Sequence, residues 1–233
     1  YKDLLKKDIN LIIISSYDNF HSQQIIDFVK NGIHVFVEKP LCITKKEINK
    51  IKKVLKKNPY VKFSSNFVLR TKKTFKHLKS IIEKQKFGKT YYFEGDYNFG
   101  RLEKITAGWR SKILSYSVMH GGGIHLIDLI MWINNKKIIK VFADGNNIST
   151  YNTKFKSKDL VVSILKFEDG SIAKVTANFG SVTPHHHTLN IYGTKGTYFH
   201  SHRNDLIYNS RNPKFKPKNI FFKKNYVNQG HVL

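Results

Sequence analysis

The segment Gly-Gly-Gly-Ile-His-Leu-Ile-Asp at residues 121–128 contains a histidine and an aspartate at a spacing that suits acid–base chemistry. A helix that begins near Gly123 presents His125, Asp128 and Trp132 on one face. In the first turn of such a helix the dipole disfavours the protonated imidazole, so His125 is expected to be neutral and able to accept a proton as a general base. The alternative is that the glycines supply a tight turn with close packing and that Asp128 is only an exposed charge.

Glu38, Lys39 and Pro40 form a second candidate segment, because they directly follow a short apolar run at residues 33–37. If that run is a strand of a parallel sheet, the tripeptide lies at the carboxyl end of the strand, where open α/β sheets bind their ligands. A lysine in that place can face a substrate. The alternative is a charged loop with a turn-forming proline.

Three further features carry weaker signals. The glycines at residues 121–123 lack the Lys-Ser/Thr pair of a phosphate-binding loop, which excludes that type of nucleotide site. The run His185-His186-His187 can bind a metal, but neighbouring strand residues point to opposite faces and no cysteine or carboxylate cluster accompanies the run. We therefore predict a loop or strand edge there and no metal site. Trp109 and Arg110 either stack on or bind a polar ligand, or they pack in an interface.

The elements that must position these residues begin with alternating strands and helices. The β-branched run at residues 11–14 predicts a strand covered on both faces. Thr44, followed by Glu47 three residues later, predicts a capped helix. The complete alternation of strand, helix, strand, helix and strand covers residues 11–14, 19–30, 33–37, 44–57 and 61–66. This order is typical of an open parallel sheet of the Rossmann type.

Beyond residue 70 the pattern becomes α+β. Helices are predicted at about residues 74–84 and from residue 123 onward. Strands separated by glycine-containing turns are predicted at residues 90–98, 138–146, 160–167, 172–179, 188–192 and 197–202. They predict a large, mainly antiparallel open sheet. We therefore expect an α/β domain at residues 1–67 and an α+β domain at residues 68–233, while the pattern leaves the structure from residue 204 onward open.

Charge and cysteine content limit the partners and the compartment. The 233 residues include 36 lysines but only 5 arginines, and the net charge is +25. The lysines are spread through every segment, whereas proteins that recognise nucleic acid specifically depend mainly on arginine. We therefore predict a lysine-rich solvated surface and no nucleic-acid partner.

The longest apolar run falls far short of the roughly 18 residues that span a membrane. Cys42 is the single cysteine, which favours a reducing, cytoplasmic environment.

Taken in order, several segments resemble the glucose-fructose oxidoreductase, inositol dehydrogenase and rhizopine-catabolism (Gfo/Idh/MocA) family. The resembling segments are residues 12–16 with His21, residues 32–41, Asn66, Trp109-Arg110, residues 123–128 and residues 191–197. The resemblance implies an amino-terminal Rossmann domain that binds NAD or NADP. It further implies an α+β domain that binds substrate and forms a homo-oligomer through its open sheet. The implied reaction is hydride transfer between nicotinamide and a hydroxyl or ketone of a sugar, cyclitol or nucleotide sugar.

The resemblance also implies roles for single residues. Lys39 would bind the reacting hydroxyl and stabilise its developing alkoxide, while His125 would remove or return the proton. Trp109, Arg110 and Asp128 would contact the substrate, and Asp128 would in addition orient or support its helix. The residues implied along the cofactor are Ser15, Ser16, His21, Glu38, Lys39 and Asn66.

Two features depart from the family pattern. Many relatives have an acidic residue four positions before the catalytic histidine, but here that position is Gly121, with His120 beside it. We therefore expect two catalytic residues, Lys39 and His125, and leave the role of His120 open.

The second departure concerns the pyrophosphate. In the family, a glycine-rich turn cradles the pyrophosphate, and the same region sets the choice between NAD and NADP. Both features precede the region that the chain matches. We expect a fragment of a longer oxidoreductase that leaves apolar sheet surface uncovered and lacks this cradle as it stands. The alternative is a noncatalytic sugar-binding or assembly protein with the same fold.

Overall fold

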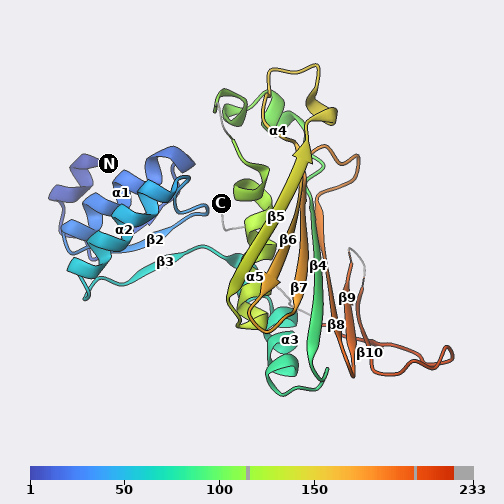
Figure 1. Cartoon of the computed structure of the whole chain (residues 1–233). Coiled ribbons are helices and arrows are strands. Elements are labelled where there is room, and N and C mark those ends of the chain that lie inside the picture. The colour runs from blue at the N-terminus through green and yellow to red at the C-terminus, as the bar shows by residue number, and fades with distance from the viewer. Residues whose placement is uncertain (114–115, 202–203, 223–233) are drawn as a thin grey trace. The chain divides into compact units, whose positions relative to one another are not determined.

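A computed structural model describes residues 1–113, 116–201 and 204–222 of the chain (Figure 1). By its internal contacts the chain divides into two compact units, Tyr1–Phe67 and Val68–Leu233. Each unit has its own hydrophobic core. Within the described ranges, no helix is long and apolar enough to cross a membrane.

The first unit is a three-stranded parallel sheet with the order β1-β2-β3. Its elements are β1 (Leu11–Ile14), α1 (Asp18–Lys30), β2 (His34–Val37), α2 (Lys45–Lys57) and β3 (Phe63–Ser65), preceded by a 3₁₀ turn (Lys2–Lys6). In the register, Ile14 pairs with Val37 and Val37 pairs with Ser65. The residues that follow the three strands therefore emerge along one edge of the sheet.

The start of α2 confirms the predicted capping signal. The Glu47 amide donates to Thr44 Oγ1 at 3.2 Å, and the Thr44 amide donates to Glu47 Oε2 at 2.9 Å. This reciprocal arrangement satisfies two backbone donors that the first helical turn otherwise leaves without acceptors.

The prediction that β1 is covered on both faces is wrong. Leu11 and Ile13 are 56% and 65% exposed, whereas Ile14 is buried. The reason is that α1 and α2 pack together on the same face of the small sheet, as consecutive right-handed crossovers do, so alternate side chains of β1 remain in contact with solvent (Figure 1).

The second unit is built on an eight-stranded sheet with the order β11-β10-β9-β8-β4-β7-β6-β5, in which only the β4–β7 pair is parallel. Its strands are β4 (Thr90–Asn98), β5 (Ile138–Asn146), β6 (Leu160–Phe167), β7 (Ile172–Asn178), β8 (His186–Gly193), β9 (Thr197–His200), β10 (Asp205–Tyr208) and β11 (Lys218–Asn219). The predicted fold class, a partial parallel sheet followed by a mainly antiparallel sheet, is confirmed. Strands β10 and β11 lie where the sequence pattern left the structure open.

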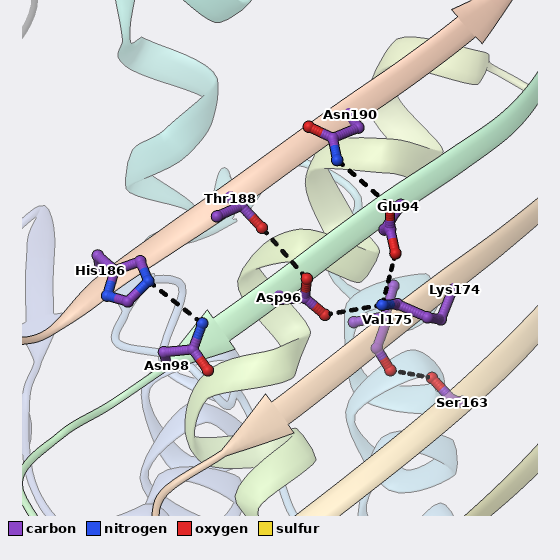
Figure 2. A network of polar contacts seen from close by, with 9 residues as sticks. All are labelled: Glu94, Asp96, Asn98, Ser163, Lys174, Val175, His186, Thr188 and Asn190. Atoms are coloured by element: carbon purple, nitrogen blue, oxygen red, sulfur yellow. Dashed lines mark hydrogen bonds and ion pairs between the residues drawn. The ribbon is translucent and has the colours of Figure 1, made fainter. Parts of the chain in front are cut away.

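Two long helices cover one face of this sheet (Figure 1). The helices of the second unit are α3 (Lys73–Glu83), the short α4 (Glu103–Thr106) and α5 (Ile124–Asn134). Phe93 and Tyr97 of β4 point into the core beneath α5, and a Cβ at Gly95 would lie 3.2 Å from Leu126. The intervening residues of β4 point to the opposite face, where they form the polar network of Figure 2.

Candidate active site

Polar side chains gather at the carboxyl ends of the strands of the first unit. Asn66 Nδ2 donates to Glu38 Oε1 at 2.6 Å, which joins the end of β3 to the end of β2. Lys39 follows Glu38 directly and is linked to Pro40 by a cis peptide bond. Ser15 is exposed at the end of β1. Because open α/β sheets bind ligands beyond these strand ends, the arrangement suits a ligand-binding edge.

His21 has an internal role in this edge. It is fully buried, and its two ring nitrogens lie 2.8 Å from the Pro40 carbonyl oxygen and 2.9 Å from the Ser16 carbonyl oxygen. His21 therefore ties the loop after β1 to the loop after β2. The Ser16 hydroxyl is also engaged locally, since it donates to Gln24 Oε1 at 2.8 Å.

The backbone before His125 differs from the prediction. Residues Met119–Gly123 form a π-helical turn that continues directly into α5, and Val118 is already helical. The free amides of the helix start therefore lie more than one turn before His125. The prediction that His125 occupies the first helical turn is wrong, and the dipole argument for its neutral form loses its basis.

All three glycines in this turn permit close packing, and two of them lie against tyrosine side chains. A Cβ at Gly121 would lie 1.9 Å from the Tyr116 hydroxyl, and a Cβ at Gly122 would lie 2.4 Å from the Tyr97 ring. Real Cβ atoms do not approach other atoms so closely, so glycine is needed at both positions. Close packing is therefore what the glycines provide, within a π-helical turn instead of a tight one.

His125 lies against an aromatic cluster that the sequence analysis did not assign. Its imidazole stacks on the Tyr97 ring, with centroids 5.9 Å apart and planes inclined by 18°. Tyr97 also contacts Phe99, Phe179 and His185. Burial, together with the nearby Tyr116, raises the pKa of Tyr97 to about 12, so its phenol stays neutral beside the imidazole. The inward position of Tyr97 in the alternating strand β4 was the available sequence signal.

His185 extends this cluster. Its Nδ1 lies 3.2 Å from the Asn98 carbonyl oxygen, and burial lowers the pKa of the imidazole. The next two histidines point to different faces of the sheet. His186 Nε2 lies 3.3 Å from Asn98 Nδ2, whereas the His187 ring contacts Phe75 and His200. The described residues contain no group of three side chains placed to hold a metal ion.

Asp128 is paired with a residue that sequence spacing did not indicate. Its two carboxylate oxygens accept hydrogen bonds from Arg70 Nε, at 2.7 Å, and from Arg70 Nη2. This two-point contact anchors α5 to the segment before α3 and engages the carboxylate within the protein. Trp132, one turn further, has Lys79 Nζ 5.2 Å from its ring centroid.

Trp109 and Arg110 both contact Tyr116, whose hydroxyl lies against Gly121 of the π-helical turn. The Arg110 guanidinium lies 4.5 Å from the centroid of the Trp109 ring, and Arg110 Nε donates to the Tyr116 hydroxyl at 3.1 Å. Arg110 therefore contacts Tyr116, and Tyr116 in turn contacts Gly121. The structure brings together Arg110, Tyr116, Tyr97 and His125 in the second unit, and Glu38, Lys39 and Asn66 in the first.

Comparison with known proteins agrees with this architecture. Residues 1–67 match the oxidoreductase family with an NAD-binding Rossmann fold, and residues 75–199, more than half of the chain, match the GFO/IDH/MocA C-terminal domain. The chain is 25% identical to myo-inositol 2-dehydrogenase of Thermotoga maritima over 198 residues, which cover 82% of this chain and 56% of that protein.

Solved structures give the same result. Myo-inositol 2-dehydrogenase from Lactobacillus plantarum superposes with a TM-score of 0.81 at 26% identity, covering 87% of this chain and 61% of that one. Scyllo-inositol dehydrogenase from Lactobacillus casei, with bound NAD(H) and scyllo-inositol, shares the fold with a TM-score of 0.75 at 24% identity over 86% and 60% of the two chains. The chain spans little more than half the length of the curated relative. On both family matches, the chain belongs to the GFO/IDH/MocA oxidoreductase family.

Proposed function

We propose that the gene product containing this chain is an NAD(P)-dependent dehydrogenase that acts on a hydroxyl group of a cyclitol, with sugars and nucleotide sugars as the wider substrate class. The observation that carries the proposal is the pair of polar sites in the two units. Lys39 follows a strand end of the NAD-binding type, and His125 is held by an aromatic ring at the start of α5. The inositol dehydrogenases among the relatives favour this function over a noncatalytic sugar-binding protein.

Lys39 and His125 divide the chemistry on the substrate hydroxyl. The Lys39 ammonium donates to the reacting oxygen and stabilises the negative charge that develops when its proton leaves. His125 accepts that proton, and it returns the proton in the reverse reaction. Trp109, Arg110 and Asp128 contact the substrate in this proposal. Arg110 is held by Trp109 and Tyr116, and Asp128 is held by Arg70.

The donor set at the edge of the first unit fits a nicotinamide dinucleotide. Ser15, Glu38, Lys39 and Asn66 offer hydroxyl, carboxylate, ammonium and amide groups beyond adjacent parallel strands. His21 and Ser16 support these loops from inside. When bound, the nicotinamide supplies the acceptor for the hydride from the carbon that bears the hydroxyl.

The test is turnover in the expressed gene product. NAD and NADP are offered with myo-inositol, scyllo-inositol, glucose and a nucleotide sugar, and reduction is followed at the nicotinamide absorbance band. Lys39→Met and His125→Ala are expected to lower kcat by about 100-fold or more with unchanged thermal unfolding, while Lys46→Met, on the exposed face of α2, retains activity. Unchanged kcat in either site variant would remove that residue from the mechanism.

We also propose that the open face of the large sheet joins two copies of the chain. Figure 2 shows Lys174 between Glu94 and Asp96 on this face, at 2.6 and 3.2 Å. Phe142 and Ile172 on the same face are 68% and 40% exposed. Light scattering coupled to size exclusion is expected to give a dimer or tetramer that Phe142→Lys dissociates. A monomeric wild type would contradict this.

A cytoplasmic location and the absence of a nucleic-acid partner stay predictions from the single cysteine and the scattered lysines. The second is checked by binding to a random DNA duplex at increasing salt, where a nucleic-acid-binding protein loses affinity steeply.

A further inference from the structure

The His21 ring lies between two backbone carbonyl groups from different loops. Its Nδ1 atom is 2.8 Å from the Pro40 carbonyl oxygen, and its Nε2 atom is 2.9 Å from the Ser16 carbonyl oxygen. Both contacts have the geometry of hydrogen bonds. A carbonyl oxygen only accepts hydrogen bonds, so each ring nitrogen has to supply a proton.

The neutral imidazole cannot satisfy both carbonyl groups. In that form one ring nitrogen carries a proton and the other carries a lone pair. The lone pair would face a carbonyl oxygen at 2.8 or 2.9 Å, which is a repulsive contact. His21 is fully buried, so bulk water does not reach the ring to replace the lost bond. Only the imidazolium, which donates from both nitrogens, makes both hydrogen bonds.

The Pro40 carbonyl belongs to the backbone segment that carries Lys39. Before Lys39, the Glu38 amide donates to the Ile14 carbonyl oxygen at 2.8 Å. After Lys39, the carbonyl is the only backbone hydrogen-bonding group of Pro40, because proline has no N–H. The hydrogen bond from His21 therefore fixes the second end of the short segment from which the Lys39 side chain projects.

Charges near His21 act in both directions. Burial, the dipole at the start of α1 and the ammonium of Lys39 oppose a cation at this place. Two hydrogen bonds from a charged donor favour the cation, and so do two carboxylates. Asp18 lies three residues earlier on α1 and shares a helix face with His21, and Glu38 precedes Lys39. The remaining titratable side chains on these segments are those of Tyr17 and Cys42.

We propose that His21 is an imidazolium that positions Lys39 by bridging the loops after β1 and β2. The proposal rests on the proposed dehydrogenase function, in which Lys39 has to lie within hydrogen-bond reach of the substrate hydroxyl. Because its ring is fully buried, His21 acts through Lys39 and is a positioning residue. Loss of its proton replaces one of the two hydrogen bonds with a repulsive contact and so releases one of the two loops.

Nitrogen NMR of the expressed gene product with isotope-labelled histidines tests the charge of His21 without an activity assay. At about pH 7, where an ordinary histidine is mostly neutral, both ring nitrogens of His21 should carry a proton. His34 is the internal comparison, because its Nδ1 accepts the Lys62 amide at 3.2 Å and therefore carries a lone pair. The signals are assigned through bonds from the backbone of the wild type. A neutral His21 ring at this pH would overturn the proposal.

The pH dependence of turnover gives a second readout. The wild-type kcat/KM should fall as the pH rises and His21 loses its proton. His21→Gln keeps a neutral donor, and it is expected to lower kcat/KM by about 10- to 100-fold, the cost of misplacing a catalytic group. Its alkaline decline should lack the component that His21 contributes to the wild type. His34→Gln, on β2, is the matched control and should keep both the value and the profile.

The outcomes separate this role from the proposed activity. A wild-type kcat/KM in His21→Gln, or an identical alkaline decline in His21→Gln and the wild type, would overturn the positioning role while leaving the dehydrogenase function intact. A wild type that oxidises no polyol with either cofactor would overturn the dehydrogenase function and with it the role toward Lys39. The NMR measurement would in that case still decide the charge of His21.

Discussion

The Tyr97 ring lies nearly parallel to the imidazole of His125, with 5.9 Å between the ring centroids. Tyr97 is itself immobilised, because its ring packs on Gly122 and lies 6.1 Å from Phe179. The stack therefore restricts the plane in which the imidazole can present its nitrogen atoms. A general base works through such orientation as much as through its basicity.

Replacing the ring is expected to release the imidazole. Tyr97→Leu should lower kcat by about tenfold, because a misplaced base loses part of its effective concentration. It should also lower the free energy of unfolding by about 2–4 kcal/mol, as a large-to-small change in a core does. Tyr97→Phe keeps the ring and should retain most of kcat. Steady-state kinetics at a temperature where both variants are folded tests this, and a wild-type kcat in Tyr97→Leu would show that the stack does not orient His125.

The contact between Arg70 and Asp128 supports α5. Asp128 is 11% exposed and Arg70 is 44% exposed, so solvent weakens the attraction only in part. A double-mutant cycle with Arg70→Gln and Asp128→Asn is expected to give a coupling of about 1 kcal/mol in urea unfolding. The more exposed pair Lys158 and Asp144, with side chains 53% and 78% exposed, is the control and should show weaker coupling. Additive effects at Arg70 and Asp128 would mean that the pair does not support the helix.

The capping box of α2 makes a separate prediction for the first unit. Thr44→Ala removes the acceptor of the Glu47 amide and should lower the free energy of unfolding by about 1 kcal/mol. Thr44→Ser keeps a hydroxyl and should recover most of this loss. Chemical denaturation of the three proteins provides the measurement, and equal stability of Thr44→Ala and wild type would argue that solvent satisfies the amide equally well.

Elements with a clear period were predictable from sequence. The strands at residues 90–98, 138–146 and 160–167 have the predicted bounds. The first and the third alternate between core and solvent, whereas residues 138–146 form the edge of the sheet and are mostly exposed on both faces. The π-helical turn before α5 was not predictable. Tyr116 and Tyr97 pack against two of its glycines, and the contact with Tyr97 comes from a separate strand, which no local pattern records.

The candidate site divides in the same way. His125 and Lys39 stand in recognisable segments, so their positions followed from sequence. Arg70 is 58 residues from Asp128, and no spacing rule connects them. Tyr97 could be placed on the inner face of its strand, but its pairing with His125 depends on how α5 crosses β4. Contacts between elements are set by packing, and sequence periodicity reports only which face each element buries.

His187 links burial to pH-dependent stability. Burial lowers the pKa of His187 well below its ordinary value, and the charges of His200 and Lys72 act in the same direction. The folded chain therefore keeps this imidazole neutral at a pH where the unfolded chain, with a pKa of about 6.5, protonates it. Because the unfolded state then binds more protons, the free energy of unfolding should be highest above about pH 7 and fall as the pH drops toward about 5.

Urea unfolding across this range should show a shallower pH dependence in His187→Leu than in wild type. His186→Leu, whose ring lies on the opposite face of the sheet, should keep the wild-type slope, and identical slopes in all three proteins would show that His187 is protonated in the folded state.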